Sequence, residues 1–286
     1  MRGKGKATLD LIAEIKRVLE QIQPASVRAA CYRLFVQKLI SDMSKGSVGR
    51  VGEQLVYARE QGIVPWPWVV DETRSVERVQ CWTDFEDHFD DLCASHQRDL
   101  WEDQPERLVM VSEKGTVRGT LLPVLDELRV KFLVCHGFAS ATAAHDLAEA
   151  SLEHDRPTKI IYVGDFDPSG LHMSEEDLPQ RLKRYGGDFE IIRVGITAED
   201  VLRGDLPDFP AADKIKDARH RWFTENHGQR CVELDAMPPP ELRARVRTAI
   251  NAHIDGDLWE ESLEREEEER DKLASRKDRI LEVFDE

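Results

Sequence analysis

The stretch Lys159-Ile-Ile-Tyr-Val-Gly-Asp-Phe-Asp-Pro-Ser-Gly-Leu-His-Met173 decides how the rest of the chain is interpreted. Its apolar run predicts a short buried strand, and the proline and glycine beyond it predict a turn before a helix that begins near Ser174. Asp165 and Asp167 follow the strand two residues apart, so an extended backbone points both carboxylates to one side. Such a pair suits Mg²⁺, and a plain polar turn is the alternative.

Strands and helices alternate around this stretch. Apolar runs predict three further strands, at 107–112, 130–135 and 189–194. Helical patterns follow the strands, at 116–128, 142–152 and 178–185. The alternation predicts a parallel α/β sheet covered by helices. The chain has neither the Gly-x-Gly-x-x-Gly nor the P-loop motif, so no nucleotide site of these kinds is indicated.

Acidic side chains follow the ends of the predicted strands. Glu113 comes directly after the first strand, Gly137 after the second, and Asp165 and Asp167 after the third. The carboxyl ends of parallel strands meet at one edge of a sheet, where open α/β folds bind their ligands. Three carboxylates at this edge predict a site for one or two divalent metal ions, which would stabilise charge on a phosphodiester.

The first 75 residues predict a DNA-binding head. Three helical patterns, at 9–22, 26–40 and 47–61, precede an extended, proline-stiffened segment at 63–70, which is the outline of a winged helix-turn-helix. The net charge of the chain is −16, yet residues 1–50 hold ten Lys or Arg against four acidic residues, a local net charge of +6. A solvated charged helix face is the alternative to nucleic-acid contact. The candidate phosphate contacts are Arg33, Lys38, Lys45, Arg50 and Arg59.

The remaining segments predict a helical connector, further helices of the α/β domain and an acidic tail. Residues 76–105 form a polar helical connector, and 211–254 add helices to a domain that spans 106–254. Residues 255–286 hold fourteen acidic against six basic residues, which predicts either a long solvated helix or a partly disordered tail. No apolar run approaches the ~20 residues that cross a bilayer. Five scattered cysteines fit the reduced thiols of a cytoplasmic protein.

Several of these motifs resemble a known family. A Glu, a Gly and an Asp-x-Asp after successive strands resemble the Toprim domain of topoisomerases, primases and some nucleases. The segment Ser26–Phe35 is similar to the one that carries the nucleophilic tyrosine in the A subunit of topoisomerase VI and in the meiotic double-strand-break protein. There an arginine precedes the tyrosine by four residues, as Arg28 precedes Tyr32. The segment Cys231–Pro238 is similar to the family's Glu-Leu-Asp-Ala-Leu stretch.

The chain also departs from this family. Cys31 stands where the family usually has an aromatic residue, and the segment 136–140 lacks the common Pro-Asp after its glycine and aromatic residue. The sequence shows no sign of an ATPase or transducer module. The chain therefore most resembles a stand-alone, shortened A-type subunit of the Mini-A kind, for which strand passage by this chain alone is not expected.

The resemblance implies a Mg²⁺-dependent protein that cleaves double-stranded DNA. Tyr32 would attack a phosphodiester beside Arg28 and form a covalent 5′-phosphotyrosine, with Glu113, Asp165 and Asp167 at the metal. The family's A subunits act as homodimers, alongside a separate ATPase B-type subunit, and such a protein would be cytoplasmic and nucleoid-associated. Two alternatives stay open: a Toprim nuclease that uses water, in which Tyr32 is structural, and a non-enzymatic DNA-binding or regulatory subunit.

Overall fold

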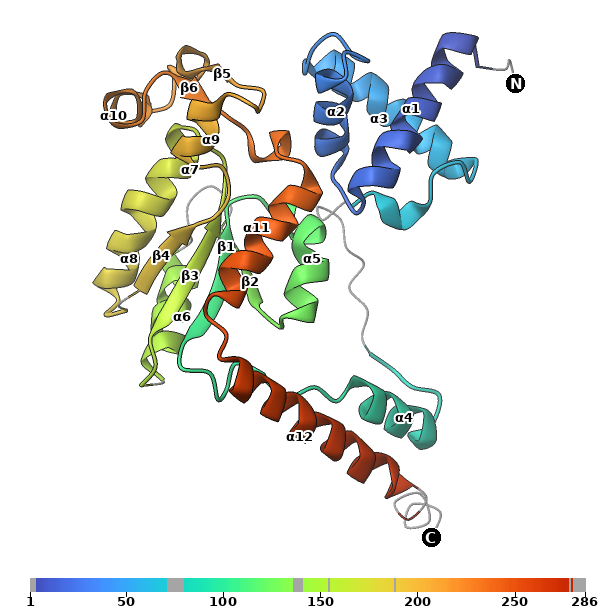
Figure 1. Cartoon of the computed structure of the whole chain (residues 1–286), viewed down its shortest axis with the longest axis vertical. Helices are drawn as coiled ribbons and strands as arrows, with labels where there is room; N and C mark the ends of the chain where they lie inside the picture. The colour runs from blue at the N-terminus through green and yellow to red at the C-terminus, as the bar shows by residue number, and fades with distance from the viewer. Residues whose placement is uncertain are drawn as a thin grey trace.

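The structure is a computed structural model that describes residues 4–70, 80–135, 141–153, 155–187, 189–277 and 279. Figure 1 shows three parts: a helical head at the amino-terminal end, an α/β body, and an arm of two helices that extends from the body. Within the described residues, no helix is long and apolar enough to cross a bilayer.

The body is built on a four-stranded sheet, which confirms the predicted parallel α/β fold. Its spatial order is β2-β1-β3-β4, and neighbouring strands all run parallel. Ser112 pairs with Val163, so β1 and β3 end at the same level. The strands are β1 (Arg107–Ser112), β2 (Lys131–Val134), β3 (Thr158–Val163) and β4 (Phe189–Arg193).

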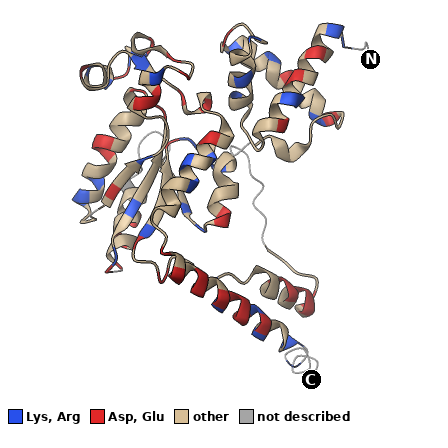
Figure 2. Ribbon diagram, in the orientation of Figure 1, with Lys and Arg blue, Asp and Glu red and all other residues tan. Residues whose placement is uncertain are grey.

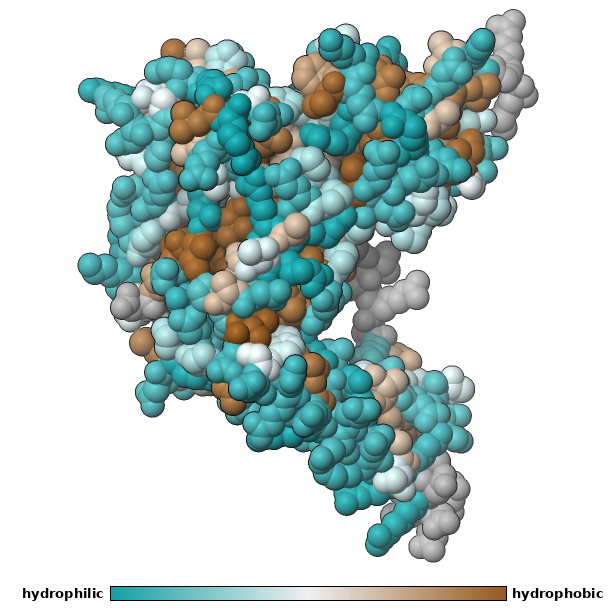
Figure 3. Space-filling model, viewed as in Figure 1, coloured by the Kyte–Doolittle hydropathy of each residue, from teal (hydrophilic) through white to brown (hydrophobic). Residues whose placement is uncertain are grey.

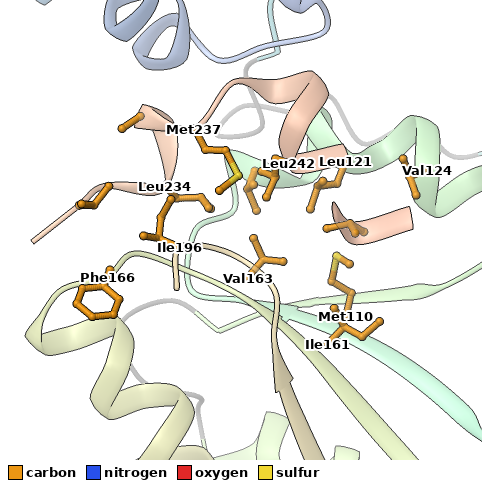
Figure 4. Packing of buried hydrophobic residues seen from close by; sticks show 14 of the residues in the cluster. Met110, Leu121, Val124, Ile161, Val163, Phe166, Ile196, Leu234, Met237 and Leu242 are labelled. Carbon is orange, nitrogen blue, oxygen red and sulfur yellow. The ribbon is translucent and has the colours of Figure 1, made fainter. Parts of the chain in front are cut away.

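Helices cover both faces of this sheet. The first face packs against α5 (Val117–Glu127) and α11 (Pro239–Asn251), and Figure 4 shows residues of this core, including Leu121, Leu242 and Met110. The second face packs against α6 (Ala141–Leu152) and α8 (Leu178–Arg184). Alternate residues of the strands face the two layers, which is why Leu108–Val111 of β1 and Ile160–Val163 of β3 are continuous apolar runs.

The helix after β3 begins earlier than the sequence predicts. It starts as α7 (Pro168–His172), passes through one π-helical turn, η2 (Met173–Asp177), and continues as α8. The expectation of a start near Ser174 was wrong because proline fits the first turn of a helix, where its missing N–H is not needed. Asp167 caps this helix by accepting a hydrogen bond from the Gly170 N–H.

The segment between β4 and α11 forms a small layer beyond the carboxyl edge of the sheet. A two-stranded antiparallel pair, β5 and β6, lies in it, so this segment is less helical than expected. The elements are α9 (Ala198–Arg203), β5 (Phe209–Pro210), η3 (Ala211–Lys214), α10 (His220–Asn226), β6 (Arg230–Cys231) and η4 (Leu234–Ala236).

The head contains the three expected helices, α1 (Lys6–Ile22), α2 (Val27–Val36) and α3 (Lys45–Glu60), packed around their own apolar core. The second helix ends before the predicted Ile40, since Lys38 has a positive φ of 59°. The segment predicted to be extended contains a 3₁₀ turn, η1 (Trp66–Trp68), a short helix whose first turn tolerates proline. Within residues 4–70, the sheet-type pairing is a single bridge between Ala25 and Val69. Residues 71–75 of the predicted winged-helix domain lie outside the described part.

The arm joins the predicted connector and the predicted acidic tail. The first part of the tail is a helix, α12 (Gly256–Ala274), and it packs against α4 (Phe85–Ser95) of the connector. Acidic residues line both helices in Figure 2, and the visible face of the arm in Figure 3 is largely hydrophilic. The base of the arm is anchored: Trp259 packs edge-on against Trp101 of the body, with ring centroids 5.7 Å apart.

Candidate functional site

The acidic residues predicted from the sequence lie at the carboxyl edge of the sheet. Glu113 follows β1 and Asp165 follows β3, and both line a cleft of about 910 Å³. Asp165 and Asp167 are 7% and 4% exposed, and Glu113 is half-buried. The cleft is lined by Arg28, Glu113, Lys114, Gly115, Thr116, Arg118, Val134, Asp165, Lys214, Glu233 and Asp235.

Two lysines bind the two aspartates. The Lys114 Nζ lies 2.8 Å from the Asp165 Oδ1 and 3.4 Å from the Asp235 Oδ2. The Lys214 Nζ lies 3.1 Å from the Asp167 Oδ2. These carboxylates therefore already hold cationic groups, and a phosphate that entered the cleft would meet the same two ammonium groups.

A distant segment of the chain completes the site. Phe166 and Val232 exchange backbone hydrogen bonds of 2.9 Å each, and the Leu234 N–H donates to the Asp165 Oδ1 at 2.7 Å. Glu233 and Asp235, on either side of Leu234, thereby reach the cleft. Sequence reasoning assigned these two acids no role, although their similarity to the family's Glu-Leu-Asp-Ala-Leu stretch was the signal that could have found them.

The turn that carries the two aspartates packs closely against β4 and α7. Arg193 in β4 donates to the carbonyl oxygens of Gly164 at 3.2 Å and of Asp165, and also to the Ser174 hydroxyl at 2.9 Å. A Cβ atom on Gly170 would overlap the carbonyl of Asp165, so glycine is needed where the helix passes under the turn. Arg193 thus fixes the turn, a role that no motif in the sequence indicated.

Burial and nearby negative charge raise the pKa values of two of these acids, Glu113 and Asp165. The pKa of Glu113 is raised to about 7 by burial and by the negative charges of Asp165 and Asp167. Burial also raises the pKa of Asp165, against the lowering effect of the Lys114 ammonium. Carboxylate oxygens match the hard, oxygen-binding preference of Mg²⁺. By the chemistry of their donor atoms, Glu113, Asp165 and Asp167 therefore fit the metal that the sequence predicted.

These three acids are more widely spread than a compact ligand set. Within the described residues, His145, Asp146 and Glu149 are the group whose ligand atoms all lie within 4.8 Å of one another, and all three are exposed on α6. Exposed acidic side chains one helical turn apart approach one another on many helix surfaces without a metal. The buried acids at the sheet edge remain the stronger candidates.

Arg28 and Tyr32 lie on one face of α2, as their spacing predicted. The Arg28 guanidinium carbon is 5.8 Å from the centre of the Tyr32 ring, and Arg28 reaches the cleft. Tyr32 is 5% exposed and packs in the core between head and body. Burial, followed by the negative charge of Glu233, raises the pKa of the Tyr32 hydroxyl to about 12. In this arrangement the phenol is sheltered and hard to ionise.

The five candidate phosphate contacts of the head fall into two groups. Lys38, Lys45 and Arg50 are exposed. Arg33 is half-buried and donates to the carbonyl oxygen of Ala236, and Arg59 lies 4.1 Å from the centre of the Trp66 ring. The first group is therefore presented to solvent, whereas Arg33 holds the head against η4.

The histidines and the cysteines contribute no side chain to the cleft within the described residues. Gly137 and His136 belong to the segment 136–140, which is outside the described residues. His172 packs edge-on against Trp222, with ring centroids 5.2 Å apart. The described cysteines are all free thiols, as expected.

Neither a scan against protein-family models nor a search of curated proteins found a match for this chain. What the cleft can do is therefore inferred from its own side chains. They combine buried acids suited to a divalent cation with Arg28, Lys114 and Lys214, which are suited to a phosphate.

Proposed function

We propose that this chain is a Mg²⁺-dependent protein that cleaves double-stranded DNA, similar to Toprim proteins of the topoisomerase VI A-subunit family. One observation carries this proposal: Glu113 and Asp165 open into the same cleft as Arg28, Lys114 and Lys214. A phosphodiester in this cleft would meet acids interleaved with guanidinium and ammonium groups.

The metal would be held by Glu113, Asp165 and Asp167. When bound, Mg²⁺ supplies positive charge that stabilises the attacked phosphate group. Lys114 and Lys214 now bind the two aspartates and would exchange these partners for phosphate oxygens. Arg28 lines the cleft and belongs to the head. The exposed Lys38, Lys45 and Arg50 of the head would bind the DNA backbone, and Arg28 would contact the phosphate that enters the cleft.

Hydrolysis by water is the reaction that the geometry supports best. The Tyr32 hydroxyl is buried with a raised pKa, and Arg28 is bound to Glu233 in place of a phosphate. The proton of the attacking water would pass to a carboxylate of the cleft that does not bind the metal. In this reaction water oxygen bonds to phosphorus, the bond to the leaving sugar oxygen breaks, and that oxygen takes up a proton.

Attack by Tyr32 is the second candidate, favoured by the closeness of Arg28 to its ring. It requires the Arg28–Glu233 pair to open so that the phenol meets a phosphate. In a homodimer, the tyrosine of one copy would meet the phosphate held at the metal site of the other copy. A separate ATPase subunit would then drive strand passage.

Incubation with supercoiled DNA and Mg²⁺, followed by denaturation with and without protease, tests both reactions. Hydrolysis gives free ends that form equally well with Tyr32→Phe and are lost with Asp165→Asn. Transesterification gives protein-linked 5′ ends that vanish with Tyr32→Phe. If the wild type leaves DNA uncut, and Asp165→Ala and Asp167→Ala bind DNA as well as it does, the cleavage proposal is wrong and a DNA-binding subunit remains.

A further inference from the structure

Tyr162, near the end of β3, has a hydroxyl group that the proposed reaction does not use. The side chain is 0% exposed, and within the described residues its hydroxyl has no hydrogen-bond partner. Buried hydroxyl groups are nearly always paired, because an unpaired one loses its bonds to water and gains nothing in return. The position of Tyr162 therefore needs an explanation.

The ring of Tyr162 points along the strand toward the acids. A Cβ atom on Gly164 would lie 2.7 Å from its Cε1 and 3.0 Å from its hydroxyl oxygen, so the side chain extends past the end of β3. Tyr162 pairs in register with Val111 of β1, and Glu113 follows Val111 by two residues. Glu113 is the first residue after β1, so it leaves the sheet at the same end as the Tyr162 ring.

The other charged group beside the ring already has its bonds. The Arg193 guanidinium lies 5.4 Å from the ring centre of Tyr162 and donates to acceptors that hold the aspartate turn. Burial and the negative charge of Glu113 raise the pKa of the Tyr162 hydroxyl, so it keeps its proton and can donate a hydrogen bond. A carboxylate oxygen of Glu113 is the matching acceptor.

We propose that Tyr162 is a positioning residue whose hydroxyl donates a hydrogen bond to the Glu113 carboxylate when Glu113 holds a divalent metal. This inference rests on the proposed metal site. Carboxylate ligands of metals are commonly oriented by such a bond from a neighbouring donor, and its loss weakens metal binding. The hydroxyl has no other partner among the described residues, so it is available for this bond.

The test compares the full-length wild type with Tyr162→Phe and with a matched control, Tyr185→Phe. Tyr185 is a half-buried tyrosine on the same face of the sheet that packs against His145, 5.3 Å between ring centroids. Calorimetry with Mg²⁺ and Mn²⁺ gives the metal Kd, and thermal unfolding in EDTA gives the metal-free stability. We expect Tyr162→Phe to weaken the Kd about 10- to 100-fold. In EDTA its melting temperature should equal or exceed that of the wild type, and Tyr185→Phe should keep the wild-type Kd.

Each contrary result has a distinct meaning. If the wild type binds neither metal, the proposed metal site fails and this inference fails with it. If the wild type binds metal and Tyr162→Phe binds it equally tightly, the inference alone is wrong. A melting temperature of Tyr162→Phe well below the wild type in EDTA would also overturn it, since the hydroxyl would then have a structural partner in the metal-free protein.

Discussion

Arg28 in α2 and Glu233 before η4 form a two-point ion pair that joins the head to the body. The Arg28 Nε lies 2.5 Å from the Glu233 Oε2, and the Nη2 lies 2.6 Å from the Oε1. Two residues earlier, the hydroxyl of Ser26, the N-cap residue of α2, donates to the Asp235 Oδ1 at 2.7 Å. Since Glu233 and Asp235 also line the cleft, the position of the head and the shape of the cleft depend on each other.

Glu233→Gln should therefore loosen the docking of the head. We expect the free energy of unfolding to fall by about 1–2 kcal/mol, the range of a hydrogen-bonded ion pair that is partly open to solvent. Urea denaturation measures this loss. Glu14→Gln, which removes the partner of Arg17 on the exposed face of α1, is the control and should cost no more than about 0.5 kcal/mol. Equal effects of the two substitutions would contradict a docking role.

The raised pKa of Glu113 predicts a pH dependence of stability. Between the ordinary value of 4.5 and about 7, the folded protein holds a proton on Glu113 that the unfolded chain has lost. The stability of the metal-free wild type therefore falls as pH rises through this window. Glu113→Gln should match the wild type near pH 4.5 and exceed it by about 2 kcal/mol at pH 8. Urea denaturation in EDTA at both pH values checks this, and a constant difference would refute it.

Much of the sheet could be predicted because each strand contains a short apolar run, and acids follow β1 and β3. The start of the helix after β3 could not, since the proline looked like a helix breaker until Asp167 was seen to cap it. The roles of Glu233 and Arg193 depend on contacts between distant segments, which no local pattern reports. Burial of Tyr32 likewise arises from packing of the head on the body.

Lys214→Ala should tighten metal binding at the sheet edge. The ammonium of Lys214 lies 3.1 Å from the Asp167 Oδ2 and competes with a divalent ion for this oxygen. Its removal leaves Asp167 with less positive charge nearby, so we expect the Kd for Mg²⁺ to fall several-fold, which corresponds to about 1 kcal/mol. Calorimetry measures this change. Lys216→Ala, a neighbouring lysine, is the control, and weaker Mg²⁺ binding by Lys214→Ala would contradict a metal site that includes Asp167.

Glu266 is the residue whose loss should detach the arm. It is 3% exposed, accepts from the Arg98 N–H at 2.8 Å, and pairs with Arg129 and with Arg270. Glu266→Gln leaves the partly buried Arg129 and the more exposed Arg270 without their counter-charge, which should lower the free energy of unfolding by about 2 kcal/mol. Limited proteolysis should then cut at α12 sooner than in the wild type.

The pH dependence gives an independent check on this anchor. Hydrogen bonds from Arg129 lower the pKa of Glu266 to about 2, so its contribution is present above the ordinary value of 4.5 and is lost as pH falls toward 2. The gap in stability between the wild type and Glu266→Gln should narrow over this window. Glu268→Gln removes an exposed partner of Lys272 on the same helix and should change stability by less than about 0.5 kcal/mol at any pH. Should Glu268→Gln release the arm as readily as Glu266→Gln, the total charge of α12, and not the buried pair, would be what holds it.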